Sequence, residues 1–89
     1  MASICPECVP NYTGGDGEPL CVVCREDAYH EGGPAQLCGA HQLTIGLNNL
    51  CIVCEEPLAG SGNLPARVCV SHLNLPPEEP CAKCLMLAQ

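Results

Sequence analysis

Apolar residues occur in short blocks along this chain, and the clearest helical pattern follows His41. Leu43, Leu47 and Leu50 recur at intervals of four and three residues, which is the spacing of one helix face. Asn48-Asn49 suits the end of such a helix. The pattern predicts one short helix in this stretch.

A second leucine pattern follows His72, with Leu73 and Leu75. Pro76-Pro77 comes directly afterwards, and proline cannot continue a helix because it lacks the backbone N–H and clashes with the preceding turn. This helix is therefore predicted to end after about one turn.

Three segments are rich in turn residues. Residues 31–34 read Glu-Gly-Gly-Pro and residues 59–63 read Ala-Gly-Ser-Gly-Asn. Such clusters mark turns, and each is predicted to lie in a short β-hairpin. Residues 9–20 hold three glycines and two prolines without a helical pattern, so this segment is predicted to be a turn-rich connector.

The composition cannot supply a thick hydrophobic core. Of 89 residues, 20 are Leu, Ile or Val, none is Phe or Trp, and 10 are Cys. Chains of this size bury a limited share of their surface and often need disulfides or metal ions as staples. We therefore expect one small domain with little regular structure, stabilised through its cysteines.

The cysteines are spaced as metal ligands. All ten belong to C-x2-C or C-x2-H pairs, here called half-sites, and two of the three histidines complete such pairs. A two-residue gap lets both side chains of a tight turn reach one tetrahedral ion. The twelve ligands suffice for three four-coordinate Zn²⁺ ions: Cys5, Cys8, Cys21, Cys24, Cys38, His41, Cys51, Cys54, Cys69, His72, Cys81 and Cys84.

Disulfides are the alternative use of ten cysteines. The first residues, Met1 to Pro6, show neither the basic start nor the apolar stretch of a secretory signal. We therefore expect a cytoplasmic protein, in the host cytoplasm if it is viral, with reduced thiols. A secreted framework of five bridges stays open, although it gives no reason for His to follow Cys at a fixed offset.

The half-sites repeat with a period of roughly 30 residues, and self-similarity at a fixed period indicates a repeated structural unit. Cys21-Val-Val-Cys24 leads through residues 25–37 to Cys38-Gly-Ala-His41. Cys51-Ile-Val-Cys54 leads in the same way through residues 55–68 to Cys69-Val-Ser-His72. The chain is therefore predicted to contain two copies of one unit.

These two repeats resemble treble-clef zinc fingers, in which a knuckle and a hairpin precede a helix that carries the last two ligands. The resemblance covers roughly residues 21–75 and implies one metal on Cys21, Cys24, Cys38 and His41, and one on Cys51, Cys54, Cys69 and His72. The residue after each knuckle is Arg25 or Glu55, where the family commonly has Gly. Treble clefs serve several functions, so the resemblance implies none in particular.

Cys5, Cys8, Cys81 and Cys84 would then share a third metal that joins the two ends of the chain. We favour this arrangement of two fingers and a clasp. A sequential pairing of neighbouring half-sites, separated by the segments 9–20, 42–50 and 73–80, is a second option, and a cross-braced pairing is a third.

The favoured pairing divides the single zinc-binding domain, residues 1–89, into four parts. These are an N-terminal knuckle and connector over 1–20, finger 1 over 21–50, finger 2 over 51–77, and a C-terminal knuckle with an apolar tail over 78–89. The tail, Leu85 to Ala88, is expected either to pack over the core or to anchor a partner.

Charge argues against nucleic acid as the ligand. The formal charge is −7, with only Arg25, Arg67 and Lys83 basic. Ten thiolates would add ten negative charges and three Zn²⁺ six positive ones, which moves the charge to −11. Phosphate binding needs Lys and Arg to release counterions. No apolar run approaches the length of a membrane span.

Catalysis is not expected from this pattern. A catalytic zinc keeps one coordination position open, whereas the ligand count closes all three sites. His30 is the one histidine outside a half-site and is expected on the surface. No small-molecule substrate is therefore predicted.

The function that fits best is a non-catalytic adaptor that binds a basic protein partner, such as a small accessory protein of a bacterium or phage. The first alternative is a nucleic-acid-associated zinc finger in a transcription complex. The second is a structural or assembly subunit.

Overall fold

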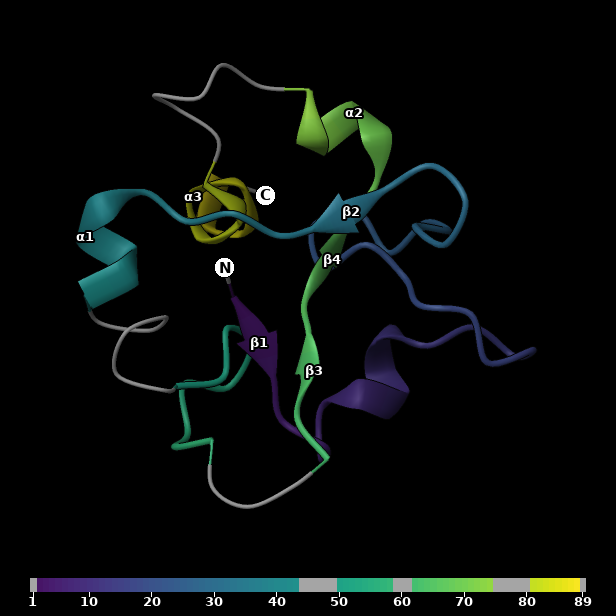
Figure 1. The fold of residues 1–89 in the computed structure, drawn as a ribbon, viewed down its shortest axis with the longest axis horizontal. Helices are drawn as coiled ribbons and strands as arrows, with labels where there is room; N and C mark the ends of the chain where they lie inside the picture. The colour runs from purple at the N-terminus through teal and green to yellow at the C-terminus, as the bar shows by residue number, and fades with distance from the viewer. Residues whose placement is uncertain (1, 44–49, 59–61, 75–80, 89) are drawn as a thin grey trace.

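Short strands and helices are joined by turns in the computed structural model, which describes residues 2–43, 50–58, 62–74 and 81–88 (Figure 1). The domain measures 34 × 31 × 19 Å, with a radius of gyration of 11.9 Å. In chain order the elements are β1 (Ser3–Ile4), the 3-10 helix η1 (Val9–Tyr12), β2 (Gly33–Pro34), α1 (Gly39–His41), β3 (Leu64–Pro65), β4 (Arg67–Val68), α2 (Val70–Leu73) and α3 (Ala82–Ala88).

Three alanines form a closed cycle of backbone hydrogen bonds in the core. The N–H of Ala2 donates to the oxygen of Ala35 at 3.2 Å, and the N–H of Ala35 donates to the oxygen of Ala66 at 2.7 Å. The N–H of Ala66 donates back to the oxygen of Ala2 at 3.0 Å. All three residues are buried. The cycle brings three segments that are far apart in the sequence into contact.

Each of these alanines begins the same short motif, Ala-x-aliphatic-Cys. The aliphatic residues are Ile4, Leu37 and Val68, and all three are buried. The Cys of this motif begins the first half-site of the unit, and the second half-site lies further along the chain. The chain therefore contains three units: unit 1 (2–24), unit 2 (35–54) and unit 3 (66–84). The period of roughly 30 residues predicts only two repeats.

The strands join different units. β1 pairs antiparallel with β3, and β2 pairs antiparallel with β4. The residues on either side of Ala66 thus lie beside unit 1 and beside the segment that leads into unit 2, as Figure 1 shows for β3 and β4. β2 lies in the first segment predicted to turn, residues 31–34, and pairs with β4, which follows the second segment. Residues 59–61 of that second segment lie outside the described residues. Short antiparallel bridges close turns at Leu20–Asp27 and Leu50–Pro57.

The helices are short, as the sequence predicted. Cys38 and Cys69 lie at the N-cap positions of α1 and α2. α2 ends at Leu73, before the predicted proline stop at 76–77, which lies outside the described residues. Leu43 is exposed, whereas Leu50 packs against the core in a β-bridge with Pro57. These two leucines therefore do not share a helix face, and Leu47 lies outside the described residues.

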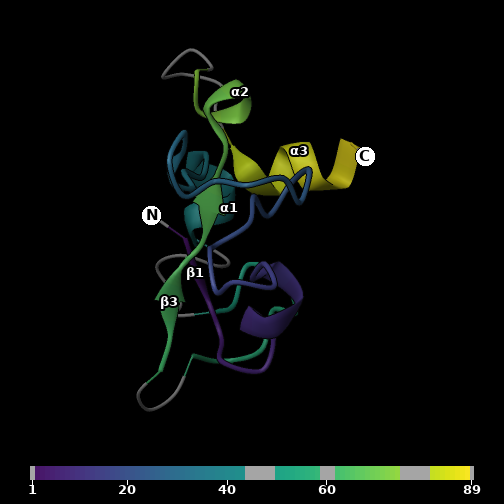
Figure 2. The ribbon, with the colours of Figure 1, turned by 90° about the vertical axis from the view of Figure 1, so that its right-hand side faces the viewer.

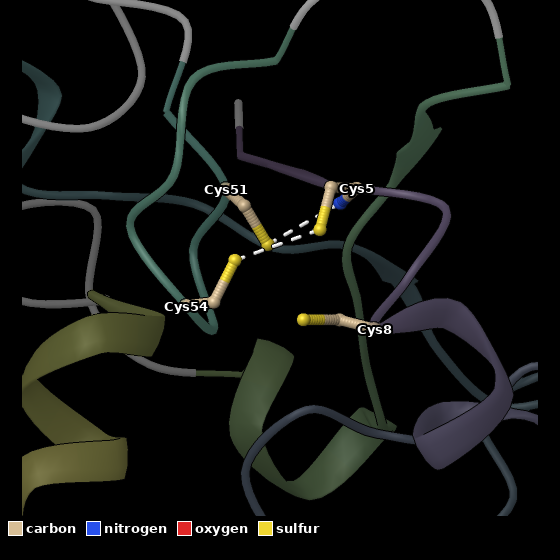
Figure 3. Close-up of side chains that lie close together, drawn as sticks. All are labelled: Cys5, Cys8, Cys51 and Cys54. Atoms are coloured by element: carbon tan, nitrogen blue, oxygen red, sulfur yellow. Dashed lines mark hydrogen bonds between the residues drawn. The ribbon is translucent and has the colours of Figure 1, made fainter.

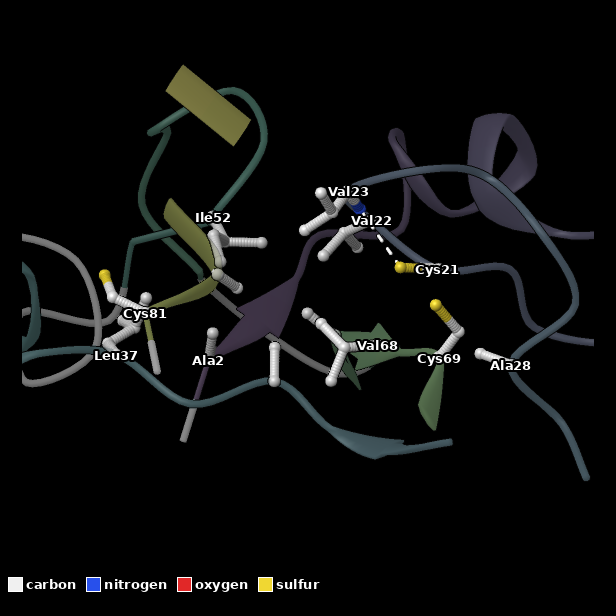
Figure 4. Packing of buried hydrophobic residues seen from close by; sticks show 13 residues of the cluster. Ala2, Cys21, Val22, Val23, Ala28, Leu37, Ile52, Val68, Cys69 and Cys81 are labelled. Carbon is white, nitrogen blue, oxygen red and sulfur yellow. Dashed lines mark hydrogen bonds between the residues drawn. The ribbon is translucent and has the colours of Figure 1, made fainter. Parts of the chain in front are cut away.

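The core is thin and made of small side chains (Figure 4). Ile52 is the largest fully buried side chain of the described residues, and it belongs to one cluster with Val22, Val23, Leu37, Val68 and several alanines. Ile52, Val22 and Val23 each lie between the two cysteines of a second half-site. These half-sites therefore supply ligands and core together.

The predicted apolar tail forms α3, which extends from one face of the domain (Figure 2). Leu85 and Met86 pack against the core, whereas Leu87 is 69% exposed. The tail therefore covers the core in part and leaves one leucine at the surface. Among the described helices, none has the length and apolar character needed to cross a bilayer.

Candidate metal centres

All twelve predicted ligands meet in three groups of four. Within each group the ligand atoms lie within 4.8 Å of one another. We name them centre 1 (Cys5, Cys8, Cys51, Cys54), centre 2 (Cys21, Cys24, Cys69, His72) and centre 3 (Cys38, His41, Cys81, Cys84). Each group can hold one metal ion.

The pairing of half-sites differs from the favoured prediction. Cys21 and Cys24 do not meet Cys38 and His41, and the two terminal half-sites do not meet each other. The sequential alternative is also wrong. Each half-site instead meets the one three places further along the chain.

This pairing links the three units in a cycle. The first half-site of unit 1 meets the second half-site of unit 2 in centre 1, and unit 2 meets unit 3 in the same way in centre 3. The first half-site of unit 3 meets the second half-site of unit 1 in centre 2. Every unit therefore contributes to two centres.

One backbone hydrogen bond recurs at every centre. The donor is the backbone N–H of the residue that follows the first Cys of a second half-site. The acceptor is the backbone oxygen of the residue two positions before the half-site that completes the same centre. The three bonds are Ile52 N–H to Ser3 O at 3.0 Å, Val22 N–H to Arg67 O at 2.8 Å, and Ala82 N–H to Gln36 O at 2.7 Å. The two halves of each centre are thus aligned by the backbone.

Each centre joins one exposed turn to one buried turn. The residues between the ligands are exposed in the first half-sites, such as Pro6 and Glu7, and mostly buried in the second half-sites, such as Val22 and Val23. The first cysteine of every second half-site is almost fully buried: Cys21, Cys51 and Cys81.

Centre 1 consists of four cysteines whose side chains converge (Figure 3). The sulfurs of Cys5 and Cys54 are 3.5 Å apart, and the N–H of Cys5 donates to the sulfur of Cys51 at 3.2 Å. Zinc–sulfur bonds of about 2.3 Å imply sulfur–sulfur edges of roughly 3.8 Å in a tetrahedron. The four sulfurs are therefore close to the arrangement around a metal ion that binds four thiolates, such as Zn²⁺.

Centres 2 and 3 each combine three cysteines with a histidine that presents Nδ1. In centre 2, Nδ1 of His72 lies 3.1 Å from the sulfur of Cys69 and 3.6 Å from that of Cys21. In centre 3, Nδ1 of His41 lies 3.0 Å from the sulfur of Cys81 and 3.5 Å from that of Cys84. A tetrahedral zinc site implies sulfur–nitrogen edges of roughly 3.6 Å.

The helical turns explain how the histidines reach these positions. Cys38 precedes α1 and Cys69 precedes α2, and each histidine follows three residues later. Residues three apart lie on the same helix face. A single turn therefore directs both ligands of a half-site to one point.

The cysteines are not paired as disulfides. All ten are free, and the sulfur–sulfur distance of 3.5 Å in centre 1 and again between Cys24 and Cys69 exceeds the roughly 2.05 Å of a disulfide. The arrangement does not support the predicted alternative of five bridges.

One thiol in each centre is acidified. Burial raises the pKa of Cys21, but hydrogen bonds from backbone N–H groups, Cys24 first, outweigh it and lower the pKa to about 7. The same balance lowers the pKa of Cys51 to about 7. The N–H of His41 and the Cys81 side chain lower the pKa of Cys38 to about 7.

A second thiol in each centre holds its proton more firmly. Burial raises the pKa of Cys24 to about 12, and it also raises the pKa of Cys8. A hydrogen bond with Cys81 and burial raise the pKa of Cys84 to about 11. Because these thiols must lose their protons to become ligands, metal binding is expected to release protons.

The residues that directly follow Cys24 and Cys54 adopt a backbone conformation that glycine favours. Arg25 has φ of 65° and Glu55 has φ of 61°, in the left-handed region. Both side chains have partners: the guanidinium of Arg25 lies 5.0 Å from the ring centre of Tyr12, and Glu55 pairs with Lys83 at 2.9 Å. Arg25 and Glu55 therefore hold a backbone conformation that usually favours glycine.

His30 lies outside the three centres, as predicted. Its ring is exposed, meets Tyr29 edge-on at 4.4 Å and lies 3.9 Å from Glu18. The sequence reasoning missed Ala2, Ala35 and Ala66, because alanine carries no chemical signal of its own. Their common position, three residues before a half-site, is the signal that would have identified them.

No family model matches the chain, and the searches of curated proteins and of solved structures likewise found no match.

Proposed function

We propose that three Zn²⁺ ions fold this chain into a rigid, non-catalytic adaptor that binds a basic protein partner. The observation that carries the proposal is the closed donor set of each centre, in which four protein ligands lie within 4.8 Å. Structural zinc sites have four protein ligands, whereas catalytic sites keep one position for water. Zinc bound here would supply folding energy.

Centre 2 is the part of the fold closest to a treble clef. It joins the Cys21–Cys24 knuckle to Cys69 and His72 at the first turn of α2. The knuckle and the helix come from different units. We propose a treble-clef-like centre assembled across the cycle in place of two tandem fingers.

The placement of the basic side chains disfavours nucleic acid. Lys83 is buried and paired with Glu55, and Arg67 donates to the oxygen of Gly32 at 3.4 Å. Arg25 lies over Tyr12. Phosphate contacts need cations that are free to meet the backbone, and these three are engaged within the domain.

Exposed carboxylates favour a cationic partner. A hollow of about 400 Å³ next to centre 1 is lined by Cys5, Pro6, Glu7, Glu56, Pro57 and Asn63. Glu7 and Glu56 are both exposed. A four-thiolate centre filled by Zn²⁺ carries a formal charge of −2, which adds to the negative potential. We propose that a lysine or arginine of the partner binds here.

Binding of a synthetic Lys- and Arg-rich peptide, followed by fluorescence anisotropy, tests this function. We expect binding that weakens with salt and falls in the double variant Glu7→Gln, Glu56→Gln. Glu31→Gln removes one exposed carboxylate outside the hollow and serves as the control.

The same assay with duplex DNA and RNA separates the alternatives. Salt-dependent binding to a duplex, with none to the peptide, would support the nucleic-acid-associated alternative instead. Stable self-association of the purified chain, measured by its mass in solution, would favour an assembly subunit, for which the exposed Leu87 of α3 is the supporting observation.

A further inference from the structure

Lys83 is the only buried charged residue among those the structure describes, with 8% of its surface exposed. Its ammonium donates to the backbone oxygen of Ile52 at 3.1 Å and pairs with a carboxylate oxygen of Glu55 at 2.9 Å. Burying a lysine is costly unless its charge is compensated. Its position therefore requires a physical reason.

The three units differ at this point. The residue before the last cysteine of the second half-site is Val23 in unit 1, Val53 in unit 2 and Lys83 in unit 3. A valine suits this position in two of the three units, so the backbone does not require lysine. Lys83 is a departure from the repeat.

The lysine lies between two metal centres. It belongs to the Cys81–Cys84 half-site of centre 3, and it contacts Ile52, which lies between Cys51 and Cys54 of centre 1. In Figure 3 the ribbon of α3 lies on the side of the Cys54 turn. The ammonium thus connects the half-sites of two different centres.

The charges of the centres also differ. With a divalent ion, the four thiolates of centre 1 leave a formal charge of −2, whereas the three thiolates of centre 2 or centre 3 leave −1. The buried cation therefore contacts the half-site of the most negative centre. Attraction between opposite charges is strong where water is excluded.

We propose that Lys83 acts as a positioning residue that stabilises metal in centre 1 and couples its affinity to the filling of centre 3. A metal in centre 3 fixes the first turn of α3 and holds the ammonium beside centre 1. Emptying centre 3 releases that turn and weakens centre 1. Linkage makes the effect reciprocal. The inference rests on the metal binding proposed above.

The first test measures the zinc affinity of each centre in Lys83→Val, which restores the residue of the other two units. Chelator competition is combined with alkylation of released thiols, and peptide masses identify the emptied centre. We expect the affinity of centre 1 to fall about tenfold, within the usual range for coupled sites, and that of centre 2 to stay unchanged. Lys83→Arg, which keeps the charge, should restore most of the affinity.

Glu55→Gln separates this role from that of a simple ion pair. If Lys83 serves the metal centre, removing the competing carboxylate leaves the affinity of centre 1 unchanged or raises it. If the ion pair merely holds the structure, Glu55→Gln and Lys83→Val lower the affinity equally, and the proposal is overturned. An unchanged affinity in Lys83→Val overturns it as well.

The coupling between centres 1 and 3 is tested by disabling centre 3 with Cys84→Ser, once in the unmodified chain and once in the Lys83→Val variant. The change should lower the affinity of centre 1 about tenfold when Lys83 is present and much less in the Lys83→Val background. Equal losses in both backgrounds contradict the coupling. Native mass spectrometry keeps the two proposals apart, because fewer than three zinc ions in the unmodified chain contradicts the three-metal fold itself.

Discussion

The backbone N–H of Ala66 donates to the carbonyl oxygen of Ala2 at 3.0 Å, which closes the hydrogen-bond cycle through Ala35. The bond joins the last unit of the chain to the first. Because both residues are almost completely buried, a larger side chain at either position has no space to occupy.

Ala35, the third alanine of the cycle, is also completely buried. Ala35→Leu is therefore expected to destabilise the fold by about 1–3 kcal/mol, the usual cost of overpacking a core. Ala88→Leu adds the same side chain at an exposed position of α3 and should have little effect. Thermal unfolding of the zinc-loaded variants measures both. Equal stability of the two variants would show that the alanine cycle tolerates larger residues.

Chelation at neutral pH is expected to unfold the chain. Structural zinc contributes about 10–16 kcal/mol of apparent binding free energy in small domains, and the thin core around Ile52 offers little to replace it. Circular dichroism during chelator titration follows the loss of structure, and native mass spectrometry counts the ions. A metal-free chain that keeps its structure would falsify this prediction.

Removal of one metal ligand should destabilise the fold more than truncation of any leucine side chain. Cys38→Ser removes a ligand of centre 3 and opens the cycle between units 2 and 3. Leu37→Ala, at the neighbouring buried position, is expected to cost about 2–5 kcal/mol. Denaturation at fixed free zinc compares them, and a less stable Leu37→Ala variant would contradict the dominance of the metal.

The stability of the fold is expected to decrease as the pH is lowered. The pKa of Cys21, Cys38 and Cys51 is about 7 in the folded chain against an ordinary value of 9.0. A lowered folded-state pKa contributes stability that is complete above about pH 9 and is lost as the pH falls through about 7. Bound zinc competes with the same protons and moves this loss to lower pH. Melting temperatures measured from about pH 9 to pH 5 at constant free zinc check the direction, and a melting temperature that rises on acidification contradicts it.

The left-handed backbone at Arg25 gives a prediction that compares two variants. Arg25→Gly and Arg25→Ala both lose the contact with Tyr12, but only glycine adopts φ of 65° without strain. The glycine variant should be more stable by about 1 kcal/mol. At the exposed neighbour Glu26, which is not among the residues with positive φ, alanine should be at least as stable as glycine. The same order at both positions would exclude backbone strain as the cause.

The candidate ligands could be identified from the sequence, whereas the groups in which they meet could not. Cysteine and histidine at a two-residue spacing identify a half-site, because the turn alone brings both side chains together. Which half-sites meet depends on contacts between distant segments. The spacing around Cys38 suits several partners, and only the tertiary structure selects Cys81 and Cys84.

The third repeat was missed for a related reason. A repeat that begins at Cys21 separates Cys5 and Cys8 from the unit to which they belong. Starting instead at Ala2, Ala35 and Ala66 places two half-sites in every unit. The residues between cysteines also carry information, because Val22 and Ile52 are buried and Glu7 is exposed, but this contrast fits more than one pairing.

The cyclic linkage has a consequence for a broken polypeptide. With all three centres filled, every unit would share one ion with each of the other two. A single peptide-bond cleavage between units 1 and 2 would then leave residues 2–24 attached through both Cys8 in centre 1 and Cys24 in centre 2. Metal coordination would then link the units in addition to the peptide chain, and a chain cleaved once should hold together until the metal is removed.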